Sequence, residues 1–116
     1  MTPRNNTINY IEFPLIDAKE TQRFYAQAFG WEFTAWGEDY LGFSGAGIDG
    51  GFNAVDDAKP TEPGILVVLY ADDLERKNEL VATAGGEITK PIYAFPGGRR
   101  FHFRDPNGNE LAVWSA

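Results

Sequence analysis

The chain has 116 residues, of which 43% are hydrophobic, and a formal net charge of −7. This length and composition suit one folded domain with its own core. The acidic excess repels nucleic-acid phosphates and anionic lipids, so we expect neither nucleic acid nor a membrane as a partner. The absence of cysteine excludes disulfides and cysteine-based metal sites. MTPRNNTIN at the start lacks the apolar stretch of a signal peptide, and we expect a cytoplasmic protein.

A faint internal repeat organises the chain. Residues 8–34 align without a gap with residues 64–90, so that Asp17 falls on Asp73. Each copy begins with an apolar run rich in β-branched and aromatic residues, which is typical of a strand. Each run ends at aspartate, a residue that favours the start of a helix. The repeat therefore predicts two units of the same construction.

In the first copy, IEFPLI (11–16) predicts a strand, and a helix follows from Asp17, whose N-cap is reinforced by Glu20 in capping-box position. The helix is expected to end at Gly30. Its apolar face contains Ala18, Tyr25, Ala28 and Phe29. Three short apolar segments then predict three strands, at WEFTAW (31–36), YLGFSG (40–45) and GIDGGFNA (47–54).

The second copy follows the same order. ILVVLY (65–70) predicts a strand, and Asp72 with Glu75 predicts a capped helix that ends at the Gly85-Gly86 pair. The expected strands are GEIT (86–89), RRFHFR (99–104) and NELAVW (109–114), with an irregular loop, KPIYAFPGG (90–98), at the rim of the sheet.

We predict an α+β fold, a single domain over residues 1–116 made of two tandem βαβββ units that form a curled mixed sheet. The first unit is expected to span residues 8–53 and the second residues 64–116. Residues 54–63, which are polar and carry two prolines, are expected to be the linker.

The doubled βαβββ unit, FYAQAFGW (24–31) and RDPNGNELAVW (104–114) together resemble the vicinal oxygen chelate superfamily. That superfamily includes glyoxalase I, extradiol dioxygenases, fosfomycin-resistance enzymes and bleomycin-resistance proteins. The resemblance implies that each unit curls into half a barrel and that two units pair around a cupped site, often across a homodimer. DPNG (105–108) also has the composition of a β-turn, so we expect it to be structural.

The resemblance also implies where metal ligands would lie, on the first and last strands of the units. The expected positions hold Tyr10, Asp49, Leu66 and Ala112. Only one of these four is a usual ligand. We therefore expect the usual metal site to be lost and no metal or other cofactor to be required.

A displaced site remains an alternative. If the superfamily's inward positions are retained, Glu12 and Glu110 point into the cup, where His102 is a candidate third ligand or base. For His102 we favour a polar strand residue without chemistry over a ligand contact or a metal ligand. Glu12 either serves the pocket or forms an ion pair with Arg99 or Arg100, and Glu110 is more simply an edge-strand charge.

Aromatic residues exceed what a small core needs, so some are expected to line a ligand cup. The candidate ligand-binding residues are Tyr10, Glu12, Trp36, Tyr93, Phe95, His102, Glu110 and Trp114. Such an aromatic and acidic cup favours a cationic or aromatic small molecule.

Three functions follow, in order of preference. The first is a metal-free homodimer that binds a small molecule, similar to the bleomycin-resistance proteins. The second is a metal-dependent lyase, isomerase or dioxygenase with displaced ligands, which would chelate two neighbouring substrate oxygens. The third is a pairing or regulatory module without small-molecule chemistry.

Overall fold

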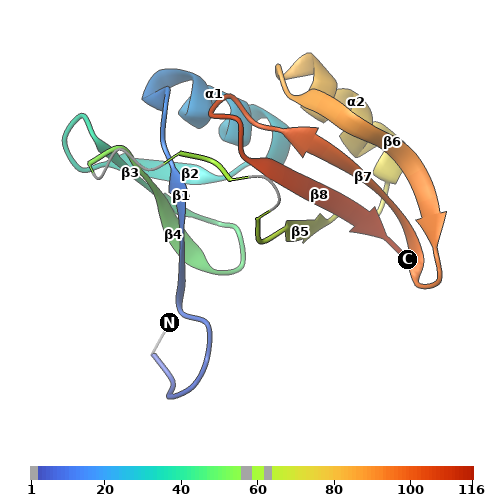
Figure 1. The fold of residues 1–116 in the computed structure, drawn as a ribbon, viewed down its shortest axis with the longest axis horizontal. Helices are drawn as coiled ribbons and strands as arrows, with labels where there is room; N and C mark the ends of the chain where they lie inside the picture. Colours follow the sequence, from blue (N-terminus) through green and yellow to red (C-terminus); the bar gives the residue numbers. More distant parts are fainter. Residues whose placement is uncertain (1–2, 56–58, 62–63) are drawn as a thin grey trace.

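The computed structural model describes residues 3–55, 59–61 and 64–116, which form two four-stranded sheets and two helices (Figure 1). The elements in chain order are β1 (Tyr10–Pro14), α1 (Ala18–Phe29), β2 (Glu32–Ala35), β3 (Tyr40–Ser44), β4 (Asp49–Asn53), β5 (Val67–Tyr70), α2 (Leu74–Thr83), β6 (Glu87–Phe95), β7 (Gly98–Arg104) and β8 (Glu110–Ser115). The predicted α+β fold with two βαβββ units is confirmed. In the described residues neither helix is long and apolar enough to span a membrane.

The two sheets have the same topology. Their strand orders are β1-β4-β3-β2 and β5-β8-β7-β6, so the first strand of each unit pairs in parallel with the last, and the other pairs are antiparallel. The predicted linker (54–63) falls between β4 and β5 in the sequence. Residues 56–58 and 62–63 of that linker lie outside the described residues, so its boundaries stay a prediction.

Both helices begin at an aspartate whose side chain accepts a backbone N–H. Asp17 accepts from Glu20, and Asp73 accepts from Arg76, each at 3.0 Å. The expectation that Asp72 caps α2 is therefore wrong by one residue, because its carboxylate accepts the hydroxyl of Tyr70 instead. The aligned aspartates of the repeat are the two caps.

The predicted loop over residues 90–98 is also wrong, because most of it belongs to the nine-residue strand β6. β6 is the edge strand of its sheet, with β7 as its neighbour. Because no strand pairs with the other side of β6, a proline whose missing N–H faces that side costs no hydrogen bond in the sheet. The β6–β7 register shifts between Lys90 and Tyr93, around Pro91. The proline is thus accommodated by an irregularity in the strand rather than by ending it.

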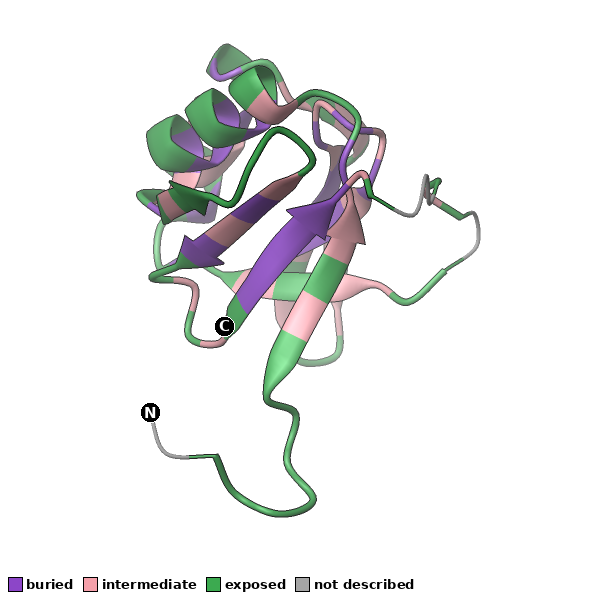
Figure 2. Ribbon diagram, turned by 90° about the vertical axis from the view of Figure 1, so that its left-hand side faces the viewer, coloured by how far each residue is buried: buried purple, intermediate pink, exposed green. Residues whose placement is uncertain are grey.

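One face of each sheet packs against the helices and forms the core. Its fully buried side chains include Phe24, Tyr25, Phe52, Phe101, Phe103, Leu111 and Val113, which come from both units. Figure 2 shows β4 buried along most of its length between β1 and β3. Because strand side chains alternate, the remaining residues of each sheet lie on its opposite face, which we call the first and second open faces.

The DPNG turn between β7 and β8 joins the second unit to the first. Asn107 Oδ1 accepts three hydrogen bonds, from the backbone N–H groups of Ile16 and Asp17 at 2.7 and 3.0 Å and from the Thr21 hydroxyl at 3.0 Å. A helix N-terminus leaves N–H groups without intrahelical partners, and the turn supplies an acceptor there. This confirms a structural role for the motif.

Asp105 holds the turn itself. Its carboxylate accepts the backbone N–H groups of Asn107 and Asn109 and the hydroxyl of Tyr25, all at 2.9 Å. Burial raises the pKa of Asp105, and these hydrogen bonds offset part of that rise.

The helices also cap each other. Arg23 of α1 donates to the carbonyl of Ala84 at the end of α2, and Lys77 of α2 donates to the carbonyl of Ala28 in the last turn of α1. Cationic side chains at helix C-termini satisfy free carbonyls and complement the helix dipole. Each unit therefore completes the helix of the other.

We expect Asn107→Ala to lower the free energy of unfolding by about 2–4 kcal/mol, because the backbone N–H groups of Ile16 and Asp17 lose their acceptor and the Thr21 hydroxyl keeps only the carbonyl of Asp17. Urea denaturation measures the change. Asn78→Ala is the matched control, since the carbonyl oxygen of Asn78 is buried without a hydrogen-bond partner in the described part of the chain. The control should change stability by less than about 1 kcal/mol, and equal losses in both variants would contradict the role of Asn107.

Asp105 predicts a pH dependence with a defined sign. A carboxyl group with a raised pKa in the folded state favours folding most when it is protonated, and that contribution falls as pH rises from about 3.9 towards the folded value. The free energy of unfolding of the parent minus that of Asp105→Asn should therefore decrease with pH in this window and then level off. Urea titrations of both proteins between about pH 3.5 and 8 test this. A difference that grows with pH would mean a lowered pKa.

Candidate functional site

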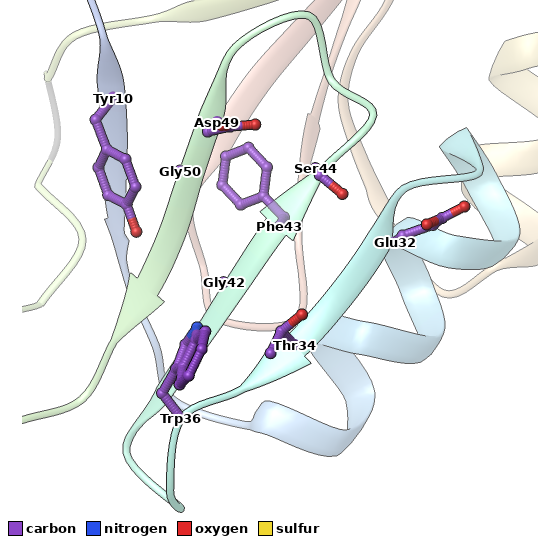
Figure 3. Close-up of a pocket in the computed structure, with 9 residues that line it drawn as sticks. All are labelled: Tyr10, Glu32, Thr34, Trp36, Gly42, Phe43, Ser44, Asp49 and Gly50. Atoms are coloured by element: carbon purple, nitrogen blue, oxygen red, sulfur yellow. The ribbon is translucent and has the colours of Figure 1, made fainter. Parts of the chain in front are cut away.

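The first open face has a floor of glycine. Gly42 of β3 and Gly51 of β4 are cross-strand partners on this face. A Cβ at Gly42 would lie 3.2 Å from Trp36 Nε1, and a Cβ at Gly51 would clash with the ring of Tyr40. Two aromatic rings thus lie against the backbone at positions where a larger residue would displace them. Figure 3 shows Trp36 beside Gly42, with Tyr10 projecting from β1.

A polar cluster borders this floor. The hydroxyl groups of Tyr10 and Tyr40 form a hydrogen bond, and Glu12 accepts from Asn53 Nδ2 at 3.2 Å. Burial raises the pKa of the Tyr40 hydroxyl, with smaller contributions from Tyr10 and Glu12. Tyr40 is therefore a hydrogen-bonding phenol rather than an anion at neutral pH.

Gly42 of this floor and Tyr10 of the cluster border an open hollow of about 240 Å³. Two carboxylates, Glu32 and Asp49, line it together with the rings of Tyr10 and Trp36. Ligand pockets usually enclose about 300–1,000 Å³. The hollow is thus the size of a partial pocket with aromatic and acidic walls.

The second open face has a chain of polar side chains across three strands. His102 Nδ1 lies 2.9 Å from Glu110 Oε2, and His102 Nε2 lies 3.0 Å from the hydroxyl of Tyr93. Arg100 Nε donates to the same hydroxyl. His102 is only 4% exposed, so both ring nitrogens are held inside the sheet surface by these two partners.

The donors fix the order of protons along this chain. Arginine can only donate, so the hydroxyl of Tyr93 accepts from Arg100. A carboxylate can only accept, so in neutral His102 the Nδ1 nitrogen bears the proton and donates to Glu110, which leaves Nε2 to accept from the hydroxyl of Tyr93. The geometry thus selects the Nδ1–H tautomer.

Aromatic rings flank the polar chain. The guanidinium of Arg100 lies 5.5 Å from the ring centroids of both Tyr93 and Phe95, within cation–π distance. Trp114 is the cross-strand partner of Arg100, and its ring centroid lies 6.4 Å from that of Phe95. Phe95 and Trp114 together form an aromatic wall beside the polar chain.

The eight predicted site residues all lie on open faces, but on two different sheets. The first face holds Tyr10, Glu12 and Trp36, and the second holds Tyr93, Phe95, His102, Glu110 and Trp114. Among the described residues, none of their hydrogen bonds, ion pairs or ring contacts joins one face to the other. The proposed meeting of Glu12 with His102 and Glu110 is not formed within the described chain.

The expected ion pairs of Glu12 are absent from the described residues. Arg99 pairs with Glu75 of α2, and Arg100 binds Tyr93, so both arginines have partners in the second unit. Glu12 is instead held by the amide of Asn53.

The residues at the superfamily's expected ligand positions do not fit a metal. Leu66 and Ala112 have no donor atom, and the hydroxyl of Tyr10 is bonded to Tyr40. Within the described ranges no group of three or more histidine, aspartate or glutamate side chains is close enough to hold an ion. We therefore derive no chemistry through a metal.

A family model for the Glyoxalase/Bleomycin resistance protein/Dioxygenase superfamily matches residues 7–113. The chain belongs to this superfamily. The resemblance drawn from the repeat and the DPNG motif is thereby confirmed. Comparison with curated proteins finds no match.

Solved structures of the superfamily share the fold. A glyoxalase-related enzyme from Fulvimarina pelagi has a TM-score of 0.81 at 19% identity, covering 96% of this chain and 88% of its own. A glyoxalase/bleomycin resistance protein/dioxygenase family enzyme from Burkholderia phytofirmans PsJN has a TM-score of 0.78 at 16% identity, covering 92% and 96%. A superfamily member from Sphaerobacter thermophilus has a TM-score of 0.72 at 19% identity, covering 95% and 97%. At these identities the likeness concerns the fold alone.

Sequence reasoning missed several side chains of this superfamily member. Tyr40, Asn53 and Arg100 contact predicted site residues, and Gly42 lines the hollow. Arg100 belongs to the predicted strand over residues 99–104, two residues before His102, so strand alternation places both side chains on one face. Gly42 and Gly51 lie in predicted strands, but no sequence pattern indicated that aromatic rings pack on them.

We predict that the protein retains no stoichiometric metal. The untagged protein and His102→Ala are loaded with manganese, iron, nickel or zinc, desalted and measured by elemental analysis. Well below one ion per chain is expected in both, because the described donors do not converge. Near-stoichiometric metal in the parent and none in the variant would contradict this and restore a displaced site.

Proposed function

We propose that this superfamily member binds a small organic molecule against its open faces without a metal. Gly42 carries this proposal, because it lets Trp36 lie close to the backbone and both residues line the hollow. Glycine weakens a strand, and within strands it often marks a place where another group approaches the backbone closely.

The chemistry of the hollow favours a cation with an aromatic or apolar body. Glu32 and Asp49 line it, and the chain as a whole has a net charge of −7. Aromatic faces attract organic cations, and carboxylates add to that attraction. An anionic ligand would meet repulsion from the same groups.

A second copy of the chain is part of the proposal. The hollow is smaller than usual ligand pockets, and apolar side chains remain exposed, with Ile65 at 95%, Ile8 at 80% and Trp36 at 69%. Pairing of two chains would cover these side chains and deepen the site. The metal-dependent alternative needs more than pairing, because Glu12 of one chain would have to reach His102 and Glu110 of the other.

Tryptophan fluorescence tests the binding site. The described chain has three tryptophans, of which Trp31 is buried in the core, Trp36 lies on the first open face and Trp114 on the second. Benzyltrimethylammonium should change the emission of the parent and of Trp114→Phe, and Trp36→Phe should lose the response. Its neutral isostere neopentylbenzene, which differs only in charge, should bind at least about tenfold more weakly.

The outcomes are separable. A response that is lost in Trp114→Phe but kept in Trp36→Phe would move the ligand to the second face. The absence of any response at millimolar cation would contradict the proposed ligand class. Sedimentation of the same samples tests pairing, and a monomer at all accessible concentrations would contradict the proposed pairing of two chains.

A further inference from the structure

The polar chain on the second open face does more than satisfy a buried histidine. One neutral partner for each ring nitrogen would be sufficient for that purpose. Here the partners are a carboxylate and a phenol, and the phenol is itself bound by a guanidinium. Every group in the chain can exchange a proton or stabilise the charge that such an exchange produces.

Two positively charged side chains flank the polar chain near His102 and Glu110. Lys90 of β6 is the cross-strand partner of His102, and Arg104 of β7 is the cross-strand partner of Glu110. Glu110 is therefore the carboxylate directly bonded to the imidazole, with positive side chains around the pair. Glu110 lies against the imidazole and Arg100 against the phenolic oxygen, so each reacting group has a directly bonded partner of opposite charge to the one that proton transfer would place on it.

The end of the polar chain at Tyr93 is accessible to a small molecule. Tyr93 is partly exposed, and the aromatic wall of Phe95 and Trp114 stands next to it. A phenolic oxygen that accepts from Arg100 and donates to His102 keeps one lone pair for a further donor.

We propose that the second open face is a metal-free proton-transfer site, in which Tyr93 takes a proton from a bound planar aromatic molecule and His102 receives the proton of Tyr93. The inference builds on the ligand binding proposed above but concerns the other face. Tyr93, which touches the substrate, and His102, which accepts the transferred proton, are the catalytic residues. Glu110 and Arg100 are positioning residues.

The proton count of the step balances. The substrate proton moves to the free lone pair of the Tyr93 oxygen while the phenolic proton moves to His102 Nε2. The phenol ends neutral, the imidazole ends as an imidazolium held by Glu110, and the bonding electrons stay on the substrate. Arg100 stabilises negative charge that develops on the oxygen during the exchange.

The only histidine in the sequence makes the first test unambiguous. Nitrogen-15 NMR of His102 in the parent should give the Nδ1–H tautomer in the neutral form. Tyr93→Phe should shift the Nε2 resonance by removing its hydrogen-bond donor, and Glu110→Gln should raise the population of the other tautomer. A neutral Nε2–H tautomer in the parent would overturn the inference, because Tyr93 could not then deliver a proton.

The second test measures proton removal directly, with 5-nitrobenzisoxazole as the probe. A base takes the proton from its ring carbon, the carbon–hydrogen electrons form the third carbon–nitrogen bond, and the nitrogen–oxygen bond breaks to release a coloured phenolate. We expect the parent to exceed the rate of equal free imidazole by about 10²–10⁴-fold. When pH is varied, the rate of proton removal should change in proportion to the fraction of neutral His102 that NMR measures at the same pH.

Variants separate chemistry from structure. Tyr93→Phe should lower kcat by at least about tenfold with KM within about threefold, and Glu110→Gln should lower kcat less. Tyr70→Phe and Glu87→Gln are the controls and should keep the parent rate, since Tyr70 bonds Asp72 and Glu87 pairs with Arg104. Loss of activity in the controls as well would overturn the assignment.

Binding of the same probe is followed by quenching of Trp114. Binding without turnover would overturn proton transfer and leave ligand binding intact. No binding up to the solubility of the probe would overturn the assigned substrate class on this face, while the cation titration of the first face decides the proposed function separately.

Discussion

The hydrogen bonds accepted by Asn107 are the interaction on which the relation of the two units depends. One side-chain oxygen in the β7–β8 turn serves three donors at the start of α1, so the second sheet must end where the first helix begins. Arg23 and Lys77 fix the other ends of the helices in the same reciprocal manner. A buried donor without an acceptor is costly, so few other arrangements of the units remain favourable.

This constraint decides where chemistry can occur. The helices are held against one face of each sheet, and that face is filled by aromatic and aliphatic side chains such as Phe52 and Phe103. The alternate residues of the same strands have no helix above them. Polar and aromatic groups therefore collect on the open faces, and on one of them Gly42 and Gly51 let the rings of Trp36 and Tyr40 lie against the backbone.

The sequence predicted what depends on local pattern. The repeat, the helix starts and the strand patterns were sufficient for the fold, whereas strand alternation alone did not decide on which side of its sheet His102 lies. It did not predict partners that depend on register between strands distant in sequence, such as Tyr40 with Tyr10. Local signals also misled twice, because Asp72 lies one residue from the cap at Asp73, and Pro91 can be accommodated within an edge strand.

Ala112 occupies one of the expected metal-ligand positions and also lies beside the polar chain. This residue is the cross-strand partner of His102 and is fully buried although it lies on the open face. A longer side chain there would need the imidazole to move, since a filled site tolerates added volume poorly. The superfamily resemblance places a metal ligand at this position, whereas here the carboxylate stands at Glu110 and points at His102. The small side chain of Ala112 therefore leaves the space in which the imidazole lies between Glu110 and Tyr93.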